Sequence, residues 1–201
     1  MIASVDILYD SAFTMMDFMR YDRHAAANAL LIRYLGNTSD KHLDALATFP
    51  LFTSLRAAIR ANVQLARLGR GCRDEADAMQ SAQAYFELAH LTIFPSAPTL
   101  VAIGGLSGTA KSVLACAIAP DVMPQPGAVI LRTDILRKQL LQVNEADRLA
   151  QSAYQPEITK QIYEILVQRT SLILSQGHSV VVDAVFADQR SEPRSKIPRT
   201  S

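Results

Sequence analysis

Apolar and polar positions follow two different periods along the 201 residues of the chain. Up to about residue 94, apolar residues recur at steps of three and four, which is the spacing of one helix face. After residue 98, short apolar runs alternate with stretches of helical period. Strands that alternate with helices are typical of a parallel α/β sheet. The pattern therefore predicts a helical region over 1–94, a stiff linker at 95–98 and an α/β region over 99–187.

Four helices are expected in the first region. The first spans 5–19, the second ends at Gly36, the third covers much of 50–68, and the fourth runs from about 74 to 92. The fourth helix carries an apolar face that should point into a core. That face consists of Met79, Ala82, Phe86, Ala89 and Ile93.

The second region predicts three strands and the helices that connect them. The strands are expected at 99–104, 128–132 and 179–183, and the helices at 113–119, 134–142 and 156–176. The remaining tail, 188–201, is polar and holds two prolines, so we expect it to be disordered.

A glycine-rich turn joins the first strand to its helix. Strand, glycine-rich turn, Lys-Ser and helix form the layout of a phosphate-binding P-loop. In such a loop, glycines bring backbone N–H groups close to a polyphosphate, the lysine neutralises it and the serine hydroxyl ligates Mg²⁺. An ordinary turn with an exposed lysine is the alternative. The predicted loop consists of Gly105, Leu106, Ser107, Gly108, Thr109, Ala110, Lys111 and Ser112.

Ala110 departs from the usual P-loop pattern, which has a second glycine at that place. A positive φ would cost alanine about 1–2 kcal/mol. Because the position opens a helix, we expect a helical φ instead.

Asp134 and Arg137 follow the second strand, at the edge where ligands of open α/β sheets bind. The Asp134 carboxylate could accept the proton of an acceptor hydroxyl, and Arg137, one helical turn later, could hold an acceptor anion. Alternatively, Asp134 caps a helix that begins at Ile135.

Asp183 ends the β-branched run of the third strand. An acidic residue at the end of a buried strand beside a P-loop can hold Mg²⁺ together with Ser112. The alternative is a strand-end aspartate that begins a turn.

The overall composition restricts the partners. The formal net charge is +1, and a basic stripe with interleaved aromatic residues is missing, so the sequence does not favour nucleic-acid binding. Apolar runs are shorter than a membrane span. The two cysteines, Cys72 and Cys116, have no metal-ligand spacing, which fits a reducing cytoplasm.

These motifs, in this order, resemble bacterial proteins that join an aminoglycoside phosphotransferase-like part to a P-loop ATP-binding domain. Residues 99–187 resemble the front half of that kinase-like ATPase domain, and 1–94 resemble the helical C-terminal lobe of the phosphotransferase part. The resemblance implies ATP and Mg²⁺ as cofactors, a hydroxyl acceptor of unknown identity and a partial sheet of strand order 2-3-1. An aspartate followed three residues later by arginine also resembles polynucleotide kinase.

The resemblance also marks what the sequence lacks. The phosphotransferase catalytic motifs, and the lid and further strands of a P-loop kinase, have no counterpart here, so we expect an internal fragment. Its first strand would then present an open edge, which predicts self-association. The alternative function is a catalytically incomplete piece with a scaffolding role or no independent function.

Overall fold

The computed structural model describes residues 7–36, 41–68, 75–106 and 108–185. Ser107 of the loop and the tail 188–201 lie outside the described residues, so the expectations for them are untested. Within these residues, the α-helices before the first strand are α1 (Ile7–Arg20), α2 (His24–Gly36), α3 (Lys41–Asp44), α4 (Phe49–Leu68) and α5 (Glu75–Ile93). The α/β part then follows in this order: β1 (Leu100–Gly104), α6 (Lys111–Ile118), β2 (Val129–Arg132), α7 (Thr133–Leu140), α8 (Pro156–Ser175) and β3 (Val180–Ala184).

The three strands form one parallel sheet of order β1-β3-β2. Val101 pairs with Val181 on one side of β3, and Ile130 pairs with the same residue on the other. The strands, their parallel direction and the predicted order 2-3-1 are therefore confirmed. On its other side β1 pairs with no strand of the described chain, which leaves an open edge. Self-association through this edge stays a prediction.

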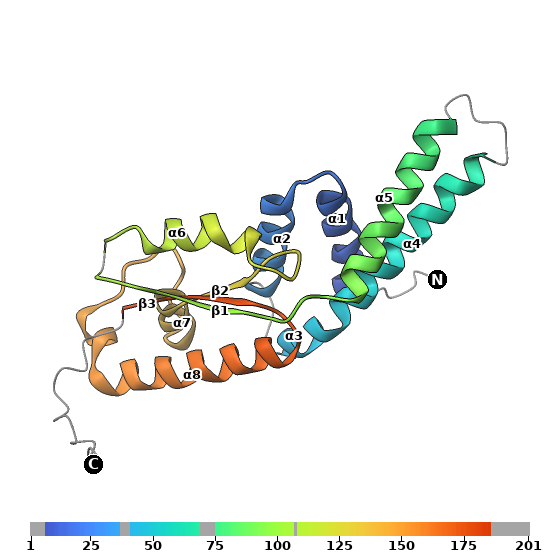
Figure 1. The fold of residues 1–201 in the computed structure, drawn as a ribbon. Helices are drawn as coiled ribbons and strands as arrows, with labels where there is room; N and C mark the ends of the chain where they lie inside the picture. Colours follow the sequence, from blue (N-terminus) through green and yellow to red (C-terminus); the bar gives the residue numbers. More distant parts are fainter. Residues whose placement is uncertain (1–6, 37–40, 69–74, 107, 186–201) are drawn as a thin grey trace, which may run out of the picture.

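Helices cover both faces of the sheet (Figure 1). On one face, α6 packs through Ala115 against Ile103 and Val181. On the other face, α7 and α8 pack through Leu136 and Ile162 against alternate strand residues, Val180 and Val182 among them. Because successive strand side chains point to opposite faces, the continuous valine run fills both layers.

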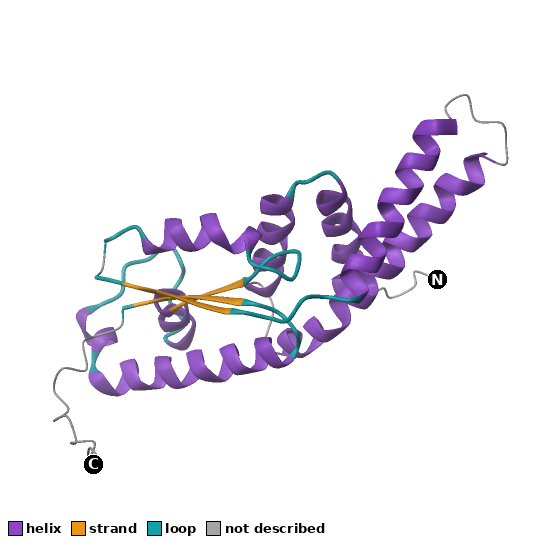
Figure 2. Cartoon of the chain, viewed as in Figure 1, coloured by secondary structure: helices purple, strands orange, loops and turns teal. Residues whose placement is uncertain are grey.

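Helices α4 and α5 form a long hairpin that projects away from the sheet (Figure 2). Small side chains are buried on both helices, among them Ala57 and Ala61 of α4 and Ala78 and Ala82 of α5. The predicted core face of the fourth helix is therefore wrong in part. Ala82 and Ala89 are buried, but Met79, Phe86 and Ile93 are 52, 65 and 39% exposed. Tyr85 and Leu88, which the pattern did not place on that face, are buried instead, so the buried face of the helix is rotated from the predicted one.

The helical region lies directly against the sheet. Asn28 of α2 is buried and donates from Nδ2 to the carbonyl of Ala128, 3.0 Å away, just before β2. Buried His178, before β3, lies 3.0 Å through Nε2 from the Leu46 carbonyl and stacks edge-on against Phe49. One buried cluster includes Leu31 of α2 as well as Val180 of β3. One buried core therefore contains residues from both sides of the segment 95–98. The division into two domains at that segment stays a prediction.

Within the described residues, no helix is both long enough and apolar enough to cross a membrane.

Candidate functional site

The loop between β1 and α6 curls around the carbonyl oxygen of Leu106. The Thr109 hydroxyl donates to this oxygen at 2.8 Å, and the Lys111 ammonium donates to it at 2.6 Å. Gly105 and Gly108 have φ of +154° and +82°, values that favour glycine. A Cβ added at Gly105 would lie 3.1 Å from the Thr109 hydroxyl and 3.5 Å from Cδ of Lys111. A side chain at Gly105 would therefore crowd Thr109 and Lys111.

Ala110 occupies the left-handed region, with φ +57° and ψ +20°. The expectation of a helical φ is therefore wrong. Ala110 is the residue before the helix, where its carbonyl already accepts the first helical bond from the Leu114 N–H at 3.1 Å. The loop enters α6 through a residue of positive φ, which glycine supplies without strain and alanine adopts at a cost of about 1–2 kcal/mol.

Ser112 and Asp183 lie side by side at the carboxyl ends of the strands. The Ser112 hydroxyl donates to Oδ2 of Asp183 at 2.5 Å, although 71 residues separate the two in sequence. The contact forms because β3 pairs directly with β1, so the end of β3 lies beside the start of α6. Both side chains offer oxygen atoms that can ligate a metal ion, and Asp183 is only 6% exposed. A turn role for Asp183 is thus not needed to explain its position.

Arg132, at the end of β2, completes this cluster. Its Nε lies 3.6 Å from Oδ2 of Asp183, so one carboxylate oxygen faces both the serine hydroxyl and a guanidinium. The sequence interpretation did not single out Arg132. Its place at the end of the strand next to β3 is the signal that could have found it, since strand ends converge in a parallel sheet.

Asp134 lies in the first turn of α7, which begins at Thr133. The alternative of a cap for a helix that begins at Ile135 is therefore wrong, and Arg132 is the residue before the helix. The Asp134 carboxylate is about half exposed, and Lys138 Nζ approaches it at 3.6 Å. An acidic residue is favourable there because the N-terminus of a helix is the positive end of its dipole.

Arg137 lies inward rather than in the open. It is 6% exposed, and its Nη1 donates to the Ala153 carbonyl at 2.8 Å and to the Thr159 hydroxyl at 3.4 Å. Its guanidinium also stacks 4.7 Å from the ring centre of Tyr154. Asp134 and Arg137 therefore make separate contacts, to Lys138 and to the segment before α8.

The oxygen atoms of Ser112 and Asp183 are suitable ligands for Mg²⁺. The described residues contain no cluster of three or more His, Cys, Asp or Glu side chains that could hold a metal. Mg²⁺ is typically held by one or two protein oxygens together with phosphates and water. The hydroxyl of Ser112 and the carboxylate of Asp183, already in contact, match that type of site.

Comparison with known proteins supports this interpretation of the second region. Residues 100–196 match the model of a family described as an AAA domain. The match supports a P-loop nucleotide-binding module of the kinase or ATPase kind. It begins at residue 100, so the resemblance of 1–94 to a phosphotransferase lobe stays a prediction.

Curated relatives extend the similarity to most of the chain. The uncharacterized proteins Rv2004c of Mycobacterium tuberculosis (strain ATCC 25618 / H37Rv) and Mb2027c of Mycobacterium bovis are each 27% identical over 188 residues, which is 92% of this chain. The chain spans only 36% of the length of each of these relatives. No solved structure matches the chain.

Proposed function

We propose that the loop over residues 105–112 binds Mg²⁺-ATP and that the module transfers the γ-phosphoryl group to a hydroxyl acceptor. The contact between Ser112 and Asp183 carries this proposal, because it joins the P-loop serine to the acidic strand end across the sheet. An ordinary glycine-rich turn would not need a buried carboxylate at that place.

The backbone of the loop, two of its side chains and Asp183 would each contribute to binding. The backbone N–H groups of the loop and of the first turn of α6 would hold the phosphates. The Lys111 ammonium would exchange the Leu106 carbonyl for phosphate oxygens. Ser112 and Asp183 would hold Mg²⁺, which supplies positive charge for the transferred group.

The acceptor side involves α7. Asp134 would take the proton of the acceptor hydroxyl while the oxygen forms its bond to phosphorus and the bond from phosphorus to the leaving oxygen of ADP breaks. The described hydrogen bonds of Arg137 use Nη1 alone, and a guanidinium has five N–H donors. Its other donors would orient an anionic group of the acceptor.

Titration calorimetry with Mg²⁺-ATP tests the proposal. Lys111→Ala should raise the Kd at least about tenfold, about 1.4 kcal/mol, because it removes the charge that neutralises the phosphates. Asp183→Asn should weaken binding in the presence of Mg²⁺ and have little effect when EDTA removes it. Lys160→Ala, which removes an exposed lysine of α8, is the matched control and should bind like the wild type.

Two results of the calorimetric titration would contradict the proposal. If the folded wild-type chain does not bind Mg²⁺-ATP, or binds it equally well after Lys111→Ala, the loop is not a nucleotide site. The conformation of Ala110 favours this second candidate, a module that has lost nucleotide binding and serves as a scaffold.

A further inference from the structure

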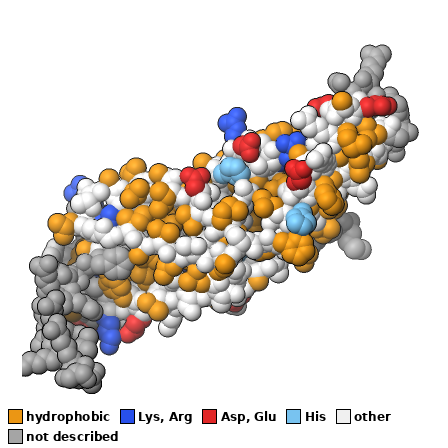
Figure 3. Space-filling model, in the orientation of Figure 1, with side chains coloured by type: hydrophobic (Ala, Val, Ile, Leu, Met, Phe, Trp, Pro, Cys, Tyr) orange, Lys and Arg blue, Asp and Glu red, His pale blue; other side chains and the backbone are white. Residues whose placement is uncertain are grey.

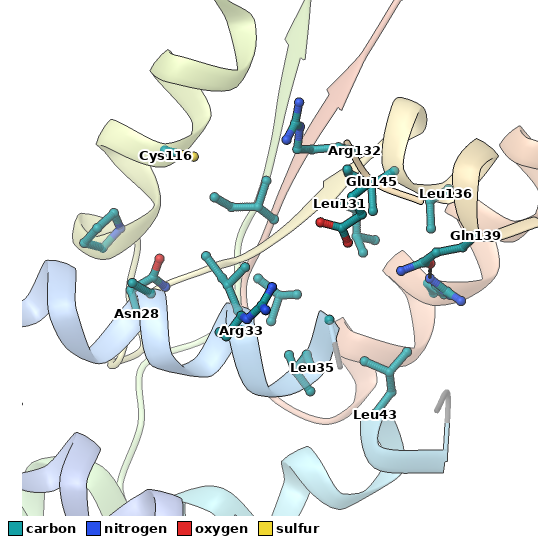
Figure 4. A pocket seen from close by; sticks show the side chains of 18 of the residues that line it. Asn28, Arg33, Leu35, Leu43, Cys116, Leu131, Arg132, Leu136, Gln139 and Glu145 are labelled. Carbon is teal, nitrogen blue, oxygen red and sulfur yellow. Dashed lines mark hydrogen bonds between the residues drawn. The ribbon is translucent and has the colours of Figure 1, made fainter. Parts of the chain in front are cut away.

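A cavity of about 860 Å³ lies along β2, and none of the described residues of the phosphate loop lines it. Helix α2 forms one wall and α7 another, with Cys116 of α6 and Glu145 also at its surface (Figure 4). Its volume is within the range of sites for small molecules. Because α2 comes from the helical region and β2 from the sheet, the cavity exists only when the two regions are docked.

The charges around the cavity favour an anion. Among the described residues that line it, Arg33, Arg132 and Arg169 are basic and Glu145 is acidic. Within the described residues, the Arg33 side chain forms no hydrogen bond or ion pair. Figure 4 shows Arg33 reaching from α2 toward the middle of the cavity and Glu145 facing it from the opposite side.

The remaining lining is largely apolar. Ile32 of α2, Ile130 and Leu131 of β2, and Ile135 of α7 contribute to it. A free inorganic ion would gain nothing from such walls, whereas a molecule with an apolar body would remove them from water. The lining therefore suits a molecule with one charged end.

The edge of β2 adds backbone groups. The Val129 N–H donates to the Ser179 carbonyl, so Val129 faces β3. Backbone groups of successive strand residues point to opposite sides, and the N–H and C=O of Ile130 therefore point away from β3. In the described sheet no strand pairs with β2 on that side. A donor and an acceptor are thus available to a ligand in addition to the arginines.

We infer that this cavity is a binding site for a small organic anion, a phosphate monoester or a carboxylate that carries an apolar body. Arg33 binds the anionic group, and the apolar side chains enclose the body. Arg132 lines the cavity and pairs with Asp183, so the bound molecule lies one side chain away from the candidate metal site.

Three probes separate the parts of this inference. Phenyl phosphate carries both an anion and a ring, inorganic phosphate carries only the anion, and phenol carries only the ring. Binding is followed by NMR shifts of the backbone amides, without nucleotide. Phenyl phosphate should bind with a Kd in the millimolar range or tighter, and each of the other two at least about tenfold more weakly. The shifted amides should be those of α2, β2 and α7.

Matched variants locate the site. Arg33→Ala should weaken phenyl phosphate binding about tenfold or more, whereas Arg67→Ala, an exposed arginine on α4, should not. Ala29 lines the cavity and Ala26 does not, although both are exposed on α2. Ala29→Phe should therefore block binding, and Ala26→Phe should leave it intact.

Other results would overturn the inference. Absence of phenyl phosphate binding, equal binding of inorganic phosphate, or unchanged binding by both Arg33→Ala and Ala29→Phe would each do so. Loss of binding on Lys111→Ala alone would place the probe in the phosphate loop instead. Because no nucleotide is present, the site can pass this test even if the chain does not bind ATP.

Discussion

Strand β3 and helix α4 use their apolar side chains in opposite ways. All five residues of β3 are buried, three consecutive valines included. Helix α4 buries Phe49 at its start, but further along its buried residues are the small Thr53, Ala57 and Ala61, while Leu55, Ile59 and Val63 are 46, 46 and 49% exposed. Figure 3 shows hydrophobic side chains over the surface of the hairpin that α4 forms with α5.

This difference separates two sources of stability. The sheet region removes large apolar side chains from water and so gains free energy from buried area. In the hairpin several of the buried side chains are alanines, and at such positions added volume is harmful. Substitutions of the same kind should therefore have different effects in the two regions.

The largest difference should come from removing apolar bulk. Ile162 of α8 is fully buried under the sheet, so Ile162→Ala should lower the free energy of unfolding by about 2–5 kcal/mol. Ile59→Ala on the hairpin surface should change it by about 0.5 kcal/mol or less. Urea unfolding measures both. Equal losses would mean that the exposed face of α4 is covered in solution. The sheet region and the hairpin would then not differ in how they bury large apolar side chains.

A larger side chain should destabilise the hairpin where it replaces a buried alanine. Ala57 of α4 is fully buried, and Ala57→Leu should cost about 1–3 kcal/mol because the helices packed around it would have to separate. Ala58 is exposed on the next position, and Ala58→Leu serves as the control with little change. Thermal unfolding followed by circular dichroism distinguishes them. A neutral Ala57→Leu would show that the hairpin contact is looser than its small residues indicate.

Acid should weaken the junction between the two regions through His178. Burial lowers the pKa of His178 below its ordinary 6.5, so the unfolded chain gains this proton at a higher pH than the folded chain. The stability contribution is complete above about pH 6.5 and is lost as the pH falls, with a slope of at most about 1.4 kcal/mol per pH unit. His178→Gln should reduce the decrease between pH 7 and 5.5. If both proteins lose stability equally, His178 is not responsible.

The smallest expected effect concerns the phosphate loop. Ala110→Gly removes the strain of a positive φ but adds flexibility to the unfolded chain, so we expect a gain of about 0.5–1 kcal/mol. Ala117→Gly, within α6, is the control and should lose about 0.5–1 kcal/mol. Denaturant unfolding of the two variants provides the comparison. A loss in both would indicate that Ala110 has a negative φ in solution.

Much of the fold followed from local patterns. The β-branched runs, the glycine-rich turn and the apolar period predict the strands and the main helices to within a few residues. The meeting of Ser112 with Asp183 could be anticipated as well, because adjacent parallel strands end at one edge of the sheet. The core face of α5 could not be chosen in this way, because apolar side chains lie on more than one side of this helix and only its packing against other helices decides which of them are buried.

The sequence by itself determined the order of strand, phosphate loop and helix, because hydrophobic period and the steric demands of glycine act over a few neighbouring residues. The tertiary structure decided the left-handed conformation of Ala110, the burial of Arg137 against Ala153, and the cavity between α2 and β2. These features depend on residues that are far apart in the chain and meet only after the helical region packs against the sheet. Contacts of this kind leave no periodic signal, because each requires a single partner at a single place.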